Sequence, residues 1–106
     1  MIINQFCKDA RSPIPIIRAL AIRTMGCLRV PKLNEYLIDP LINGLKDESA
    51  YVRKTAVLCV PKVMEVSKDL ILSKEVPEKI EFLITTEENP KVVATCLMTL
   101  KEIASY

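Results

Sequence analysis

Apolar residues recur at a helical spacing in three segments of this chain, residues 15–28, 50–63 and 90–103. When Ile17, Val52 and Val92 are aligned as the origin, apolar residues follow 4, 5, 8 and 11 positions later in all three segments. These offsets place the apolar side chains on one stripe of an α-helix. The segments begin 35 and 40 residues apart, a period typical of stacked helical hairpins.

Weaker apolar patterns predict the partner helix of each hairpin. Before the first repeat, Ile2, Ile3 and Phe6 predict the last two turns of an earlier helix. The other helices are expected near residues 15–29, 34–46, 50–65, 77–86 and 90–104. Together they predict an all-α solenoid of about two and a half stacked hairpins.

Signals for helix starts agree with these boundaries. Pro15 and Pro90 stand in a predicted first turn, where the missing N–H of proline removes no intrahelical hydrogen bond. Ser49 and Asn89 immediately precede predicted helices and are favourable N-cap residues.

Several features interrupt the helical pattern. Pro40 and Pro61 lie inside predicted helices, and each is expected to kink or break its helix at a cost of about 3 kcal/mol. Gly26 costs about 1 kcal/mol relative to alanine and is expected to let a neighbouring helix approach. Residues 67–76 break the period and predict a connecting loop that could include a short helical turn.

The composition excludes most enzyme chemistry. The chain has no His, which removes catalysis by Ser-His-Asp or Cys-His groups and His-ligated metal sites. Its two glycines, Gly26 and Gly44, are too far apart to form a glycine-rich phosphate loop. No group of lysines and carboxylates points to a reaction, so neither an enzyme nor a cofactor is predicted.

The four cysteines are widely spaced and form no C-x-x-C pair, which argues against zinc and against a disulfide scaffold. Because apolar residues flank them, they are expected to be free, buried thiols in a reduced, intracellular setting. The sequence shows no N-terminal targeting signal and no apolar run near the length of about 18 residues that spans a bilayer.

Charge is uneven along the chain, whose formal net charge is +2. Residues 1–32 contain six basic residues and one acidic residue, and residues 33–106 contain nine basic and twelve acidic residues. The basic third could contact an anionic partner such as a lipid surface, or it could be a solvated helix face. The candidates for a lipid patch are Lys8, Arg11, Arg23, Arg29 and Lys32.

A second motif spans the predicted helices 34–46 and 50–65. Leu41, Leu45, Asp47, Val52, Arg53 and Ala56 form a pattern that is similar to HEAT and armadillo repeats. This resemblance implies that aspartate and arginine side chains pair in a ladder between adjacent hairpins. Arg18 and Arg53 occupy equivalent positions, and Asp47 is the expected acid. Ser12 stands at the Asp47 position of the preceding repeat, which leaves the first rung open.

A more specific resemblance covers nearly the whole chain. Its segments are IRALAIRTMGCLRV (17–30), EYL and PL within 35–41, LKDE (45–48), YVRKTAV (51–57) and NP-x-VVA (89–94). They look like the N-terminal trunk, the helical-repeat part, of the β-adaptins, the β subunits of heterotetrameric adaptor complexes. Met1 matches an interior position of that trunk, so residues 1–106 are expected to be a fragment of a longer solenoid.

The resemblance implies a non-enzymatic scaffold in vesicle-mediated protein transport. Its expected partners are the other adaptor-complex subunits and an Arf-type GTPase, with Ile3 matching an apolar position of the GTPase contact. The family implies a cytoplasmic protein, peripheral on coated vesicles of Golgi, endosomal or plasma membranes. Clathrin is bound through family regions that this chain lacks, and the motifs leave the adaptor complex open.

Other function classes fit less well. A nuclear-transport carrier of the HEAT or armadillo class is the alternative, but such carriers tend to be acidic, unlike residues 1–32. Nucleic-acid binding would need a basic face interleaved with aromatic residues. The chain has only five aromatic residues, and Phe6 and Phe82 lie in apolar stripes, so no nucleic-acid partner is expected.

Overall fold

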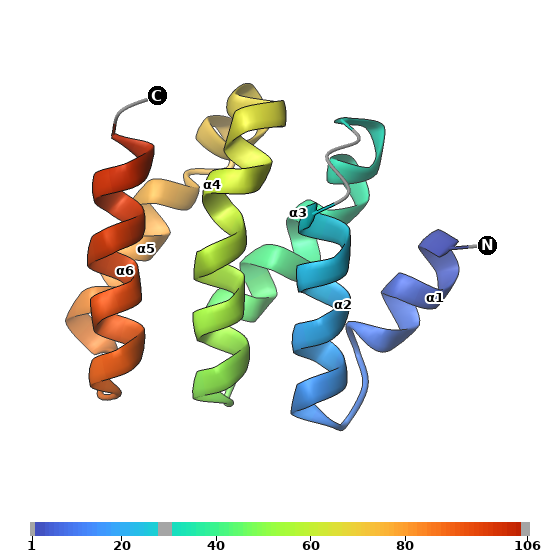
Figure 1. The fold of residues 1–106 in the computed structure, drawn as a ribbon, viewed down its shortest axis with the longest axis horizontal. Coiled ribbons are helices and arrows are strands. Elements are labelled where there is room, and N and C mark those ends of the chain that lie inside the picture. Colours follow the sequence, from blue (N-terminus) through green and yellow to red (C-terminus); the bar gives the residue numbers. More distant parts are fainter. Residues whose placement is uncertain (1, 28–30, 105–106) are drawn as a thin grey trace.

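The computed structural model describes residues 2–27 and 31–104, and the regular structure of these residues is entirely helical. The helices are α1 (Ile2–Asp9), α2 (Pro15–Cys27), α3 (Pro31–Leu45), α4 (Ala50–Ser73), α5 (Val76–Thr86) and α6 (Pro90–Ile103). Helices α2, α4 and α6 stand side by side and run in the same direction, and α3 and α5 form a second layer behind them (Figure 1). This arrangement confirms the predicted all-α solenoid.

The segment predicted as a loop is mostly helical. Residues 67–73 extend α4 to 24 residues, and only Lys74 and Glu75 separate it from α5. Ile71 and Val76 are both fully buried, so their apolar side chains form part of the core rather than of a connection. The loop prediction over 67–76 was therefore wrong. These residues do not follow the repeat, but they form helix and bury Ile71 and Val76 in the core.

The prolines do not break their helices. Helix α3 continues through Pro40, and α4 continues through Pro61, which is itself buried. The non-helical residue of α4 is Ser67, with φ −137° and ψ 58°, six positions after Pro61. Its hydroxyl accepts a hydrogen bond of 2.9 Å from the buried Asn34 side chain, which ties the bend to α3.

The core lies between the two helical layers and runs the length of the array. The predicted stripe supplies one wall, on which Ile22, Met25, Val52, Val57, Val60 and Val92 are almost completely buried. The second layer supplies Leu37, Leu41, Ile71 and Ile80. Full burial of each such side chain contributes about 1.5–3 kcal/mol. Helix α4 packs against α2 and α6 in its own layer and against α3 in the second, so it lies at the centre of this core.

Both glycines lie where helices approach closely. A Cβ on Gly26 would lie 3.2 Å from the Cβ and Sγ atoms of Cys59, which agrees with the expected contact between helices. Gly44 is closer still to its neighbours: a Cβ there would lie 2.9 Å from Ile22 Cδ1 and 3.0 Å from Ala56 Cβ.

The predicted caps differ from each other. Asn89 caps α6 with its side chain, which accepts a 2.9 Å hydrogen bond from the Lys91 N–H. Ser49 occupies the N-cap position of α4, but its side chain makes no capping bond. Instead its backbone N–H donates to Asp47 Oδ1 over 2.8 Å.

The cysteines are all free, but they do not share one environment. Cys59 and Cys96 are buried as expected, and burial raises the pKa of each thiol to about 11. Cys7 is half-buried and Cys27 is exposed, so the prediction of four buried thiols was wrong for these two. The Nζ of Lys62 donates a 3.4 Å hydrogen bond to the sulfur of the exposed Cys27.

Candidate interaction surfaces and the arginine ladder

An arginine at the start of α2 joins the first two hairpins. Arg18 donates from Nε and Nη2 to the two carboxylate oxygens of Asp47, over 2.8 and 2.9 Å. Its Nη1 donates to the backbone carbonyl of Ser12 over 2.8 Å. The guanidinium therefore links the turn before its own helix to the turn before α4, and the acid of this rung comes from the following repeat.

Arg53 repeats the same geometry one hairpin later. Its Nε and Nη2 donate to the Glu87 carboxylate over 2.6 and 2.9 Å, and Nη1 donates to the Asp47 carbonyl over 2.7 Å. The Glu87 side chain is only 2% exposed and that of Arg53 is 19% exposed. Such two-pronged pairing fixes both distance and orientation between neighbouring repeats.

Glu87 was missed as a ladder residue by the sequence reasoning, although the sequence contains a signal for it. It stands five positions before Val92, as Asp47 stands five before Val52. The two acids also share a local role, because Asp47 Oδ1 accepts from the Ser49 N–H and Glu87 Oε2 accepts from the Asn89 N–H. The position of the arginines is occupied in the third repeat by Val93.

The rungs shift the pKa of both acids. The hydrogen bond from Arg53 is the main reason that the pKa of Glu87 lies below its usual value of 4.5, although desolvation opposes it. Desolvation would raise the pKa of Asp47, but hydrogen bonds from Arg18 and the Ser49 N–H outweigh it, and the pKa is lowered. The pKa of each arginine is raised, chiefly by the hydrogen bond to its acid.

A lowered carboxylate pKa makes stability depend on pH with a definite sign. The stabilisation is fully present above the unfolded-state pKa and is lost as pH falls through the folded-state value. For Glu87 the loss is therefore expected to begin below about pH 4.5 and to continue at lower pH. Urea unfolding at pH 7, 5, 4 and 3 measures it. Glu87→Gln should flatten the pH dependence, whereas a steep dependence retained in that variant would contradict the role of Glu87. The exposed neighbour Glu88→Gln is the matched control and should leave the dependence unchanged.

One face of the array combines exposed apolar and basic side chains. Positions −1 and +6 of each aligned repeat point away from the core and form two rows across α2, α4 and α6. The rows consist of Ile16, Tyr51 and Lys91, and of Arg23, Leu58 and Met98. These six residues define the α2–α4–α6 face.

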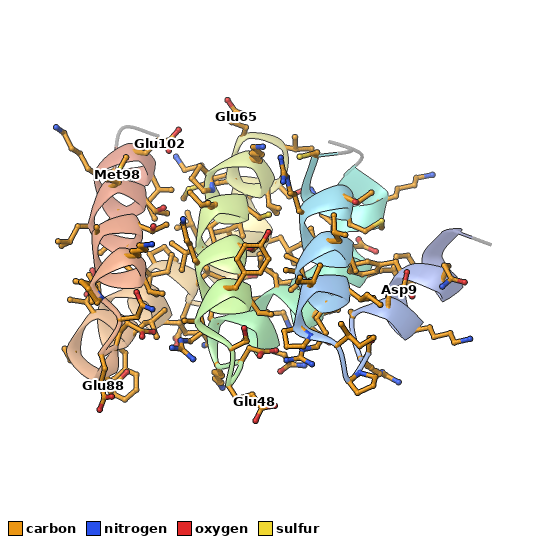
Figure 2. All side chains as sticks on the ribbon, turned by 60° about the horizontal axis from the view of Figure 1, so that its bottom comes forward. Asp9, Glu48, Glu65, Glu88, Met98 and Glu102 are labelled. Carbon is orange, nitrogen blue, oxygen red and sulfur yellow. The ribbon has the colours of Figure 1, made fainter. Side chains whose placement is uncertain are left out.

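The apolar members of this face are well exposed. Ile16, Tyr51, Leu58 and Met98 have exposed fractions of 60%, 53%, 50% and 71%. Met98 is labelled on α6 in Figure 2, with Glu65 and Glu102 along the same edge of the bundle. A set of exposed apolar side chains that spans three helices is typical of a protein-interaction site.

Residues 16–106 match the family model described as Cnd1, non-SMC mitotic condensation complex subunit 1. The chain is also 48% identical to human AP-1 complex subunit beta-1 over 104 residues, which are 98% of this chain and 11% of that protein. The chain belongs to the Cnd1 family and to the β-adaptins. The AP-1 complex subunit beta-1 of Saccharomyces cerevisiae is 45% identical over 95% of this chain, and the AP-4 complex subunit beta-1 of Mus musculus is 39% identical over the same share. The chain spans 11% of the human AP-1 protein and 14% of both the yeast AP-1 protein and the mouse AP-4 protein.

The basic residues of this β-adaptin segment do not form one compact patch. Lys8 and Arg11 lie before the start of α2, and Lys32 lies beyond its other end. The 13 residues of α2 correspond to about 20 Å along the helix axis. Arg23 is exposed on the α2–α4–α6 face, and Arg29 lies outside the described residues. The structure therefore separates Lys8 and Arg11 from Lys32.

The residue proposed for the GTPase contact lies on the first helix. Ile3 belongs to α1, but its side chain is outside the described part of the structure. Phe6, on the same helix, is only 4% exposed and packs into the core. In residues 2–27 and 31–104, no helix is long and apolar enough to cross a membrane, and no group of three possible metal ligands occurs.

Proposed function

We propose that this chain is part of a non-enzymatic scaffold subunit of an adaptor complex, which acts in vesicle-mediated protein transport. The observation that carries the proposal is its 48% identity to AP-1 complex subunit beta-1 over 98% of the chain. The relatives are much longer, so the chain is one segment of a trunk whose other regions supply further contacts, including any contact with clathrin. The nuclear-carrier alternative is not favoured, because the relatives are adaptor subunits.

The surface proposed to contact another adaptor subunit is the α2–α4–α6 face. Its exposed apolar side chains lie next to Arg23 and Lys91, so an apolar partner surface with acidic groups would complement it. A rigid array of parallel helices presents these residues without prior ordering, which lowers the entropic cost of association.

Substitution of this face tests the proposal in the full-length parent protein. The double variant Leu58→Asp and Met98→Asp is expected to reduce co-purification of the other adaptor subunits by at least about tenfold, because both charges would be desolvated at the contact. Leu72→Asp, which alters an exposed leucine beyond the bend in α4, is the control and should retain the subunits. Undiminished assembly of the double variant would exclude this face as the contact.

The remaining proposals concern the membrane. The segment acts on the cytoplasmic side of coated membranes of the Golgi, endosome or plasma membrane, where it is held peripherally by the complex. Binding of a GTP-loaded Arf-type GTPase to the parent with and without Ile3→Asp tests the contact on α1. Sedimentation with anionic vesicles at low and high salt tests lipid binding by Lys8 and Arg11, which would weaken as salt increases.

A further inference from the structure

A groove of about 770 Å³ lies on a different part of the molecule from the α2–α4–α6 face. It runs between the end of α3 and one side of α5, and it ends at the turn before α6. Its deepest apolar residues are Leu45 and Leu83, which are 3% and 8% exposed. The Arg53–Glu87 ion pair lies in the same wall, so the bottom of the groove is held by the ladder.

An aromatic side chain stands at the edge of this groove. Phe82 lines it from α5 and is 69% exposed, although its neighbour Leu83 is buried. The ring and Leu83 together offer an apolar contact site for one side chain of a partner. The α3 side of the groove contributes the buried Leu45 and the exposed Lys46.

The charges of the lining are mainly acidic. Five carboxylates and three basic side chains line the groove. Arg18 and Arg53 neutralise two of the carboxylates, Asp47 and Glu87. The other three carboxylates are those of Glu75, Glu78 and Glu88, all exposed.

These three carboxylates are available to a ligand. Within the described residues none of them takes part in an ion pair, whereas the nearby Lys79 ammonium donates to the Lys74 carbonyl over 3.1 Å. Glu78 precedes Phe82 by four positions, so these two side chains lie on one stripe of α5, and Glu75 is the N-cap residue just before the helix. Glu88 projects outward at the end of the bundle where the turn before α6 lies (Figure 2).

We propose that this groove binds a linear segment of a partner protein that carries lysine or arginine next to an apolar side chain. The apolar side chain would contact Phe82 and Leu83, and the cation would lie beside Glu78, one helical turn from the Phe82 ring. The 11 residues of α5 span about 16 Å, which matches about five residues of an extended peptide. The three unpaired carboxylates outnumber Lys46 and Lys79 in the lining, and this net negative charge disfavours anionic lipid or nucleic acid as the occupant. This binding site does not depend on the proposed adaptor function.

Fluorescence anisotropy with the whole chain tests the proposal. The probe is a fluorescein-labelled pentapeptide of alternating leucine and arginine, and the comparison peptide carries glutamate in place of arginine. The basic peptide is expected to bind at least about tenfold more tightly than the acidic one at low ionic strength, and this difference should shrink as salt increases. Equal binding of the two peptides, or no binding of the basic one, would overturn the proposal.

Variants locate the binding to the groove. Phe82→Ala is expected to weaken binding of the basic peptide by about fivefold to tenfold, and Glu78→Gln by about threefold at low salt. The matched controls are Met98→Ala, which removes an equally exposed apolar side chain on α6, and Glu81→Gln, which neutralises an α5 carboxylate outside the groove. Both controls should leave the affinity unchanged. Circular dichroism checks that each variant is folded, and an equal loss in the controls would mean that the peptide binds elsewhere.

Discussion

Gly44→Leu is expected to lower the free energy of unfolding by about 3 kcal/mol, one of the two largest effects expected in this chain. The first atom of a new side chain would already lie 2.9 Å from Ile22 Cδ1 and 3.0 Å from Ala56 Cβ. The Ile22 Cδ1 is the end of a side chain that can rotate, although Ile22 is only 2% exposed, whereas the Ala56 Cβ is fixed to its helix and moves only with α4. A larger side chain at residue 44 must therefore rotate Ile22 and separate α3 from α4.

Urea unfolding measures the loss. It is monitored by circular dichroism at 222 nm, where the helices of this fold give a strong signal. Asn43→Leu introduces the same side chain one position earlier, where the residue is exposed, and should change stability by no more than about 0.5 kcal/mol. If the two variants were equally stable, the close approach of three helices at Gly44 would not restrict the size of the side chain at this position.

Arg53→Ala is expected to lower the free energy of unfolding by about 2 kcal/mol. Removal of one member of a fully buried ion pair costs about 3–5 kcal/mol, because the other charge is left without a partner. The cost here is lower because the Arg53 side chain is 19% exposed, so water can reach the space that it leaves. The variant also leaves the Asp47 carbonyl without the 2.7 Å hydrogen bond from Nη1.

Two further variants separate charge from geometry at this rung. Arg53→Lys keeps the charge but cannot reproduce the two-pronged contact with Glu87, so about half of the loss should remain. Arg23→Ala removes an exposed arginine from α2 and should cost no more than about 0.5 kcal/mol. The same urea titration compares all three, and a loss in Arg53→Ala no greater than in Arg23→Ala would contradict the ladder as a source of stability.

The helices could be predicted because their signals are local. A stripe of apolar residues at helical spacing specifies a helix with one buried side, and its recurrence after 35 and 40 residues specifies a stack of similar units. The extension of α4 could not be found this way. Residues 67–73 do not follow the repeat, and their helical state depends on the burial of Ile71 against the rest of the core.

The candidate surfaces were less predictable than the fold. Sequence reasoning singled out Arg18, Asp47 and Arg53, but it did not identify Glu87 as the partner of Arg53. The reason is that each rung connects one repeat to the next, so the partner lies 34 residues away in the chain. The basic residues of the N-terminal third were considered together because they are close in sequence, and α2 separates Arg11 from Lys32 in space.

The sequence by itself determined the helical class, the repeat and the family, because periodicity and residue identity are properties of the chain alone. Tertiary structure alone decided which side chains meet. Stacking in parallel brings Tyr51, Leu58 and Met98 onto one face, and it places Phe82 beside a groove although its stripe suggested burial. Exposure depends on how neighbouring helices cover one another, and that contact is made between residues that are distant in sequence.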